Sequence, residues 1–159
     1  VARSRPLRRM RLQATLVDRQ PCADRSALEA FDARGWQAVA LQCDAFEWLA
    51  ASGPPCDAIV ANLFLHHFEA DALARMLALA AARTRLFIAC EPRRSAAGLA
   101  GASLLGALGC NDVTRHDAVV SVRAGFRGRE ISSLWPRGGW ALREGPRGPF
   151  SHLFVASRT

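Results

Sequence analysis

The residues CDAIVANLFLHHF, at positions 56–68, decide the fold of this chain. They begin as an apolar β run that ends at Asn62, and they then turn through a hydrophobic segment containing His66 and His67 toward a helix. A parallel α/β sheet binds its ligand at such strand ends, where the chain leaves the sheet carrying polar groups. We therefore expect two strand–helix units before this stretch and the other half of a sheet after it.

Alternating strand and helix patterns run along the rest of the chain. The expected strands are residues 12–17, 36–42, 58–61, 85–90, 140–143 and 152–156. The expected helices are residues 26–34, 45–51, 69–83, 95–108, 117–123 and 128–134, after the tail of an earlier helix at 6–10. Asp117 is expected to cap its helix, and the Gly-Pro-rich link between the last two strands predicts an antiparallel hairpin. The pattern indicates an α/β fold, a Rossmann-like doubly wound and mostly parallel sheet with an antiparallel C-terminal strand, in one domain over residues 1–159.

Composition narrows the class of protein. The chain has 159 residues, of which 50% are hydrophobic and 22% charged, so it is globular and can bury a core. The net charge of +7 comes with 21 basic residues, all arginine. Five of these arginines crowd the first eleven residues without aromatic neighbours that bases could stack on. Nucleic acid is therefore not favoured as a partner.

Cysteine usage and hydropathy point to the cytoplasm. The five cysteines are odd in number and widely spaced, without a Cys-x-x-Cys pair, so neither a disulfide framework nor a zinc site is indicated. The sequence shows no signal-peptide pattern and no apolar run approaching the roughly 20 residues of a membrane span. We expect a cytoplasmic protein with no membrane partner.

Three expected strands are followed by a polar residue at the same edge of the sheet. These residues are Asp18, Asp44 and Asn62. An acid at such a strand end suits ribose hydroxyls, which need hydrogen-bond acceptors. A second acid one unit later can accept from an adenine amino group, with Ala45 offering apolar contact to the ring. A single Asp at a strand end is more often a turn or cap residue, but three in succession favour a nucleotide site.

Four segments carry a resemblance to a known family. They are LQATLVD (12–18), QCDAFEWL (42–49), CDAIVANLFLHHF (56–68) and RLFIACEPRRS (85–95). In this order they resemble class I S-adenosylmethionine-dependent methyltransferases, nearest the small-molecule type related to ubiquinone and menaquinone biosynthesis methyltransferases. The resemblance spans essentially the whole chain. It implies S-adenosyl-L-methionine as cofactor and direct in-line methyl transfer to an oxygen or carbon atom of a small-molecule acceptor.

The resemblance also implies roles for individual residues of the cofactor site. Asp18 would bind the cofactor's ribose, and Asp44 with Ala45 would hold the adenine. Asn62 and the segment that starts at Leu63 would line the methionine and methyl-transfer end. On the acceptor side, His67, Glu91, Arg94 and residues 111–117 would face the acceptor.

The histidines are candidates for a general base, because a group with a near-neutral pKa can remove a proton from a hydroxyl acceptor. His66, His67 and His116 are the candidates, and His116 is favoured because it lies in the variable segment that covers the acceptor. His152 is expected to be structural. Adjacent residues at a helix start point in different directions, so His66 and His67 are not expected to share a metal ion. Positioning alone can also drive methyl transfer, in which case no base is needed.

Residues 117–126, with Arg127 and Arg129, allow two interpretations. They can form a lid whose arginine binds an anionic acceptor, or an amphipathic helix that packs on the sheet with its arginines in water. The sequence leaves both open.

One feature of the family is missing from this sequence. Its first strand and a Gly-x-Gly-type turn should precede Pro6, and no such stretch is present. In the family that strand lies between the strands expected at 12–17 and 58–61, which would otherwise carry unpaired backbone groups at about 1–3 kcal/mol each. We therefore expect an N-terminally truncated chain, or a partner chain or dimer that completes the sheet. The alternative function is a non-catalytic methyltransferase-like domain that no longer binds the cofactor and serves as a structural or interaction module.

Overall fold

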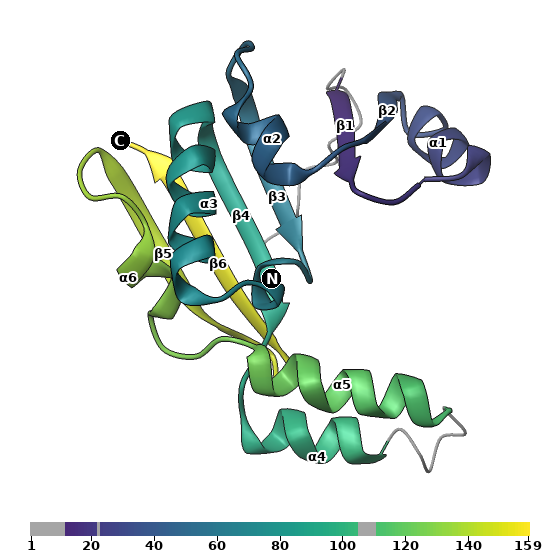
Figure 1. Ribbon diagram of the computed structural model, residues 1–159, viewed down its shortest axis with the longest axis vertical. Helices are drawn as coiled ribbons and strands as arrows, with labels where there is room; N and C mark the ends of the chain where they lie inside the picture. Colours follow the sequence, from purple (N-terminus) through teal and green to yellow (C-terminus); the bar gives the residue numbers. More distant parts are fainter. Residues whose placement is uncertain (1–11, 22, 105–110) are drawn as a thin grey trace, which may run out of the picture. The chain divides into compact units, whose positions relative to one another are not determined.

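The computed structural model describes residues 12–21, 23–104 and 111–159 (Figure 1). The chain divides into two compact units, the first ending at Ser52 and the second running from Gly53 to Thr159. The expected helix tail at 6–10 and the last residues of the helix expected at 95–108 lie outside the described residues. Within the described ranges, no helix is long and apolar enough to cross a membrane.

The first unit is a pair of parallel strands with two short helices. Its elements are β1 (Leu12–Asp18), α1 (Arg25–Asp32), β2 (Trp36–Gln42) and α2 (Ala45–Ala50). The strands pair in register from Leu12 opposite Trp36 to Asp18 opposite Gln42. Helix α1 begins where Asp24 accepts a 2.8 Å hydrogen bond from the Ala27 N–H.

The second unit is a four-stranded mixed sheet with helices. Its elements are β3 (Cys56–Asn62), the 3₁₀ helix η1 (Leu65–His67), α3 (Ala70–Arg83), β4 (Thr84–Pro92), α4 (Ala96–Leu104), α5 (Asp112–Ala124), α6 (Glu130–Leu134), β5 (Trp140–Arg147) and β6 (Ser151–Arg158). The strand order is β3-β4-β6-β5. Strands β3 and β4 are parallel, whereas β6 runs antiparallel to both β4 and β5. The α/β fold and the antiparallel C-terminal strand expected from the sequence are thus confirmed.

Apolar side chains of α3 and of the sheet form the core of the second unit. Leu77 of α3, Phe154 of β6 and Ile131 of α6 are fully buried. Trp135 packs against Phe87, with ring centroids 5.1 Å apart. Helices α4 and α5 contact each other as a pair beyond the C-terminal end of β4 (Figure 1). Helix α5 also contacts η1 and β4.

The start of α5 differs from the sequence expectation. Asp117 does not cap the helix, because the helix begins five residues earlier, at Asp112. Asn111 is the cap, and its side-chain oxygen accepts a 2.8 Å hydrogen bond from the Thr114 N–H. Asn and Asp are comparably good N-caps, so the local sequence offered two starts. The earlier start places Asp117 inside the helix.

Strands β1 and β3 each pair with a single described strand. Among the described strands, β1 pairs only with β2, and β3 pairs only with β4. These are the two strands between which the resemblance places a further strand. Val60 of β3 is 67% exposed although it belongs to an apolar strand. Such an edge carries unpaired N–H and C=O groups that another strand can bind.

Candidate active site around His66 and Glu91

The turn after β3 has a strained backbone that is held by one buried carboxylate. Leu63 has a φ of 52°, in the left-handed region that bulky residues rarely adopt. Its N–H donates to the Cys90 carbonyl at 2.9 Å. Glu91 Oε1 accepts from the next two backbone N–H groups, of Phe64 at 3.0 Å and Leu65 at 2.9 Å. Strain of this kind persists where the surroundings fix the conformation, and it is frequent at functional sites.

The same carboxylate binds the side chain of His66. Glu91 Oε2 lies 2.8 Å from His66 Nδ1, and the side chains of the two residues are 0% and 5% exposed. When Nδ1–H donates to this carboxylate, Nε2 is the acceptor nitrogen of a neutral ring. An imidazole oriented in this way can take up a proton at Nε2. A buried carboxylate at its other nitrogen stabilises the cation that forms.

His66 and His67 form one wall of an open pocket of about 520 Å³, and α5 forms the other. The residues from α5 are Asp117, Val120, Ser121 and Ala124. Their spacing of three and four residues places them on one face of the helix. That face therefore looks toward η1, which α5 contacts.

The two histidine rings lie closer together than the sequence argument assumed. Their centroids are 4.1 Å apart and the rings are tilted by 37°. Rotation about the side-chain torsions allows this, although adjacent residues of a 3₁₀ helix point about 120° apart. In the part of the chain that the structure describes, no group of three or more His, Cys, Asp or Glu residues could hold a metal ion.

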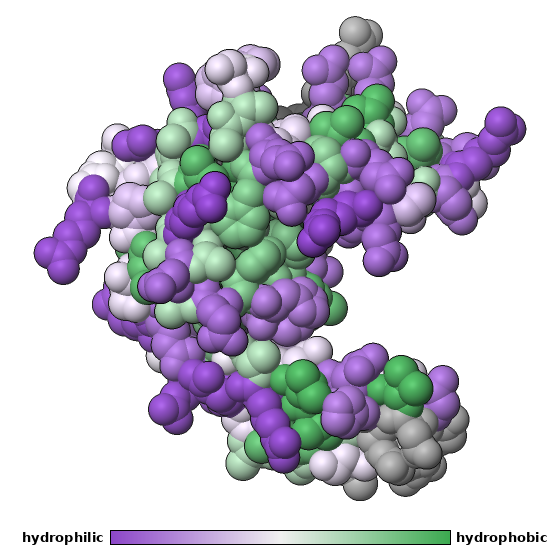
Figure 2. Space-filling model, in the orientation of Figure 1, coloured by the Kyte–Doolittle hydropathy of each residue, from purple (hydrophilic) through white to green (hydrophobic). Residues whose placement is uncertain are grey.

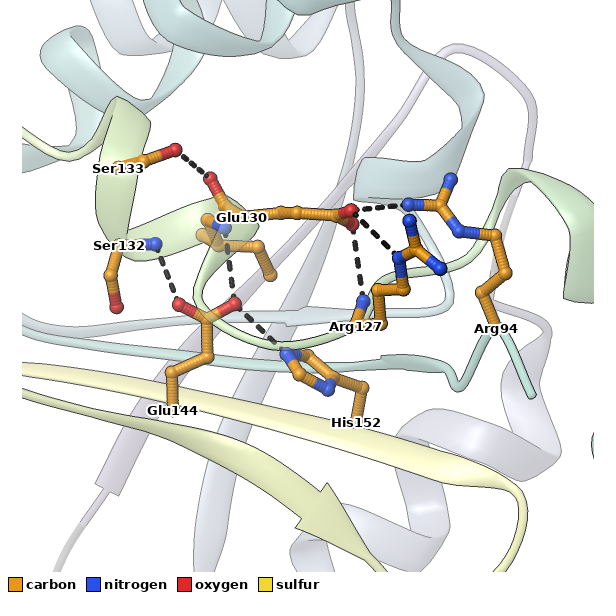
Figure 3. A network of polar contacts seen from close by, with 8 residues as sticks. Arg94, Arg127, Glu130, Ser132, Ser133, Glu144 and His152 are labelled. Carbon is orange, nitrogen blue, oxygen red and sulfur yellow. Dashed lines mark hydrogen bonds and ion pairs between the residues drawn. The ribbon is translucent and has the colours of Figure 1, made fainter.

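The other acceptor-side residues predicted from the sequence have different surroundings. His116 lies on α5 but is not among the residues that line the pocket. The guanidinium of Arg94 binds the carboxylate of Glu130, which also accepts from the Arg127 N–H at 3.1 Å. Figure 3 shows both arginines directed at Glu130. Glu91 is buried and binds the turn and His66 rather than opening onto the pocket.

A second buried network lies beside the first and was not predicted. Glu144 accepts from the N–H groups of Ile131 at 3.0 Å and Ser132 at 2.7 Å. His152 Nε2 lies 2.9 Å from Glu144 Oε1, with side-chain exposures of 1% and 0% (Figure 3). This carboxylate anchors the start of α6 to the β5–β6 hairpin. A glutamate and a histidine eight positions apart on paired strands were the only sequence signal for it.

The predicted nucleoside-binding acids belong to the first unit. Asp18 is exposed at the end of β1, and its Oδ1 accepts a 2.8 Å hydrogen bond from the Gln20 N–H. Asp44 caps α2 by accepting from the Phe46 N–H at 2.7 Å. The Cys43 N–H donates to the Asp18 carbonyl at 2.9 Å. This hydrogen bond joins the C-terminal ends of β1 and β2. Asn62 and Leu63, predicted for the methionine end, are exposed residues of the second unit.

No protein-family model matches this sequence, and no curated protein matches it either. Solved structures do match the fold. An O-methyltransferase family protein from Burkholderia thailandensis is 18% identical, with a TM-score of 0.63 over 95% of this chain and 52% of that one. The chain shares the fold of about half of this structure.

Two further methyltransferase structures share this fold. An O-methyltransferase family 2 protein from Planctomyces limnophilus, in complex with apigenin, is 14% identical, with a TM-score of 0.57 over 98% of this chain and 53% of that one. Magnesium protoporphyrin IX methyltransferase from Synechocystis, with SAH bound, is 20% identical, with a TM-score of 0.50 over 84% of this chain and 56% of that one. The chain thus spans about half the length of the solved structures that it matches.

Proposed function

We propose that this chain carries the acceptor site of an S-adenosylmethionine-dependent O-methyltransferase that acts on a small hydroxylated molecule. The observation that carries the proposal is His66, held at Nδ1 by the buried Glu91 and lining a pocket. The methyltransferase fold supports the reaction class. Two of the matched structures are described as O-methyltransferases, which favours oxygen over carbon as the methylated atom. The narrower resemblance to ubiquinone-type enzymes stays a prediction.

In this proposal His66 is the general base. Its Nε2 takes the proton of the acceptor hydroxyl as the oxygen becomes the nucleophile, while Nδ1–H remains bonded to Glu91. Glu91 is a positioning residue that fixes the ring and stabilises the imidazolium. The cofactor, when bound, supplies a methyl group on a positively charged sulfur. His67 and the α5 face hold the acceptor so that its oxygen is directed at that methyl group.

The chemistry of the first unit fits the nucleoside part of the cofactor. Ribose hydroxyls are donors, and the exposed carboxylate of Asp18 is an acceptor at a strand end. Asp44, with Ala45 next to it, would serve the adenine. The SAH bound to the Synechocystis enzyme supports this cofactor class. The assignment of Asn62 and Leu63 to the methionine end also stays a prediction.

Arg94 and His116, which the sequence predicts for the acceptor side, receive other roles in this proposal. Arg94 binds Glu130, so we propose that it stabilises the link between β4 and α6 rather than the acceptor. His116 is off the pocket, so His66 replaces it as the favoured base. A cytoplasmic location remains an expectation from the sequence.

The test is methyl transfer from tritiated S-adenosylmethionine to a panel of simple phenols, with His66→Gln compared with His116→Gln. Calorimetric titration of S-adenosylhomocysteine is run on each protein in parallel. The proposal predicts that His66→Gln loses transfer and keeps cofactor affinity, whereas His116→Gln keeps both. Equal transfer by His66→Gln and the unsubstituted chain would exclude His66 as the base.

A second candidate is a non-catalytic module, and the edge of β3 that no described strand pairs with favours it. Val60 is 67% exposed there, and the strand pairs only with β4 among the described strands. An added strand, from a partner chain or from a second copy, would cover this edge. A folded chain that binds neither S-adenosylmethionine nor S-adenosylhomocysteine would favour this reading over the enzyme.

A further inference from the structure

The pocket next to His66 has a distinctive charge pattern. Among the lining residues that the structure describes, Asp117 is the acid, and none is an arginine. Asp117 and Ser121 are one helical turn apart on the same face of α5, opposite the two histidines. Val120 and Ala124 supply the apolar part of that face, and the 47% exposure of Val120 is explained by its position on an open pocket. Figure 2 shows hydrophobic residues at the surface of the α4–α5 pair, in the lower part of the view.

We infer that the acceptor is an uncharged aromatic that carries a second hydrogen-bond donor, a hydroxyl or an amino group, beside the hydroxyl that is methylated. Asp117 selects this class. This inference rests on the proposed function, because it concerns the acceptor of the same site. It replaces the anionic acceptor that the arginines of residues 117–130 suggested in the sequence.

The chemistry of the pocket side chains requires a hydrogen-bond donor on the acceptor. An ionised aspartate only accepts hydrogen bonds, so the group that it binds must donate one. His66 Nε2 accepts the proton of the hydroxyl that reacts. The α5 wall of the pocket then faces the neighbouring substituent of the acceptor. Ser121 can accept or donate and adds no charge. A flat ring between Val120 and the histidines would cover apolar surface on both sides.

The distribution of charge around the pocket disfavours an anionic acceptor. A carboxylate in this pocket would meet Asp117 as a like charge. Two of the arginines that the structure describes near this segment, Arg94 and Arg127, both bind Glu130 instead. The pocket-lining face of α5 excludes Arg123, which is one residue before Ala124 on the helix.

The test is a binding titration that does not depend on methyl transfer. The chain is labelled with ¹³C and ¹⁵N at histidine, and the imidazole signals of His66 and His67 are followed as catechol, guaiacol or salicylate is added. Catechol offers two adjacent donors, guaiacol has one of them blocked, and salicylate replaces one with a carboxylate. We expect catechol to bind at least tenfold more tightly than salicylate and about threefold more tightly than guaiacol.

Two variants assign the preference to one side chain. Asp117→Asn should reduce the catechol-to-salicylate ratio by about five- to tenfold, because it removes the charge that rejects the anion. Asp71→Asn is the matched control, since Asp71 is exposed in the first turn of α3 and does not line the pocket. It should leave the ratio unchanged. Circular dichroism spectra of the three proteins establish that each is folded.

The outcomes separate this inference from the proposed function. Salicylate binding as tightly as catechol, an unchanged ratio in Asp117→Asn, or no shift at His66 and His67 with any probe would each overturn the inference. Selective catechol binding by a chain that transfers no methyl group would support the inference while counting against the proposed reaction.

Discussion

Glu91 Oε2 lies 2.8 Å from Nδ1 of His66, across the end of β3 and β4. The other oxygen of the same carboxylate binds the backbone N–H groups of Phe64 and Leu65. One buried acid therefore fixes both the strained turn that begins at Leu63 and the direction of the imidazole. This dual role is the basis for the first two predictions.

Replacing His66 with glutamine should lower methyl transfer by a factor on the order of 10² or more, the usual contribution of a positioned base. The effect should fall on kcat rather than on KM. The ring removes a proton in the transition state and contributes little to binding of the acceptor in the ground state. His116→Gln, at a position of α5 that does not line the pocket, should retain nearly full activity. Similar losses in the two variants would point to a general effect on folding.

Replacing Glu91 with glutamine should lower the free energy of unfolding by about 1–3 kcal/mol, because charge-assisted bonds to buried donors are weakened or lost. It should also shift the ¹⁵N signals of His66 toward a mixture of tautomers, since the amide no longer requires a proton on Nδ1. Urea denaturation and long-range ¹⁵N spectra measure the two effects. Glu69→Gln is the control, as Glu69 precedes α3 without a side-chain cap hydrogen bond. An unaltered tautomer in Glu91→Gln would contradict the positioning role.

Gly125→Ala should destabilise the second unit, because a Cβ at this position would lie 2.3 Å from the Pro92 carbonyl oxygen. The backbone must move to relieve that overlap, and steric overpacking of this kind costs about 1–3 kcal/mol. Thermal unfolding gives the comparison with Gly145→Ala, where nothing lies within 4 Å of the added atom. We expect a clear fall in Tm for the first variant only, together with altered His66 and His67 signals as α5 shifts.

Glu144→Ala should be the most destabilising of these substitutions, with a loss of about 3–5 kcal/mol, because it breaks a buried pair and leaves donors without an acceptor. The donors are the Ile131 and Ser132 N–H groups and His152. Glu130→Ala, in the partly exposed network of Figure 3, should cost about 1 kcal/mol or less. Equal losses of unfolding free energy in Glu144→Ala and Glu130→Ala, measured by urea denaturation, would show that burial of Glu144 does not set the size of the effect.

Hydrogen exchange should differ between the two parallel strands of the second unit. Among the described strands, β4 has neighbours on both sides, whereas β3 pairs only with β4, so alternate N–H groups of β3 have no described strand partner. Those amides should exchange within minutes and those of β4 much more slowly. Binding of an added strand should protect them. Uniformly slow exchange along β3 in the isolated chain would mean that the edge is already paired.

The sequence by itself determined most of the elements. Strand β2 has the predicted bounds, and α3 and α6 begin within two residues of theirs, because periodicity and caps act within one element. It also pointed to Glu91 and the histidine pair. The sequence analysis ranked His116 above His66 and placed Asp117 at a helix cap. Neighbouring residues alone determine neither which histidine lines the pocket nor where α5 begins.

Only the tertiary structure decided which histidine belongs to the pocket and which acid orients it. His66 and Glu91 are 25 positions apart, and the parallel pairing of β3 with β4 brings them together. Arg94, which the sequence predicts as an acceptor residue, pairs with Glu130, 36 positions away. Local sequence fixes conformation through the backbone of neighbouring residues, whereas the partner of a side chain depends on strand register and helix packing, which the whole fold sets.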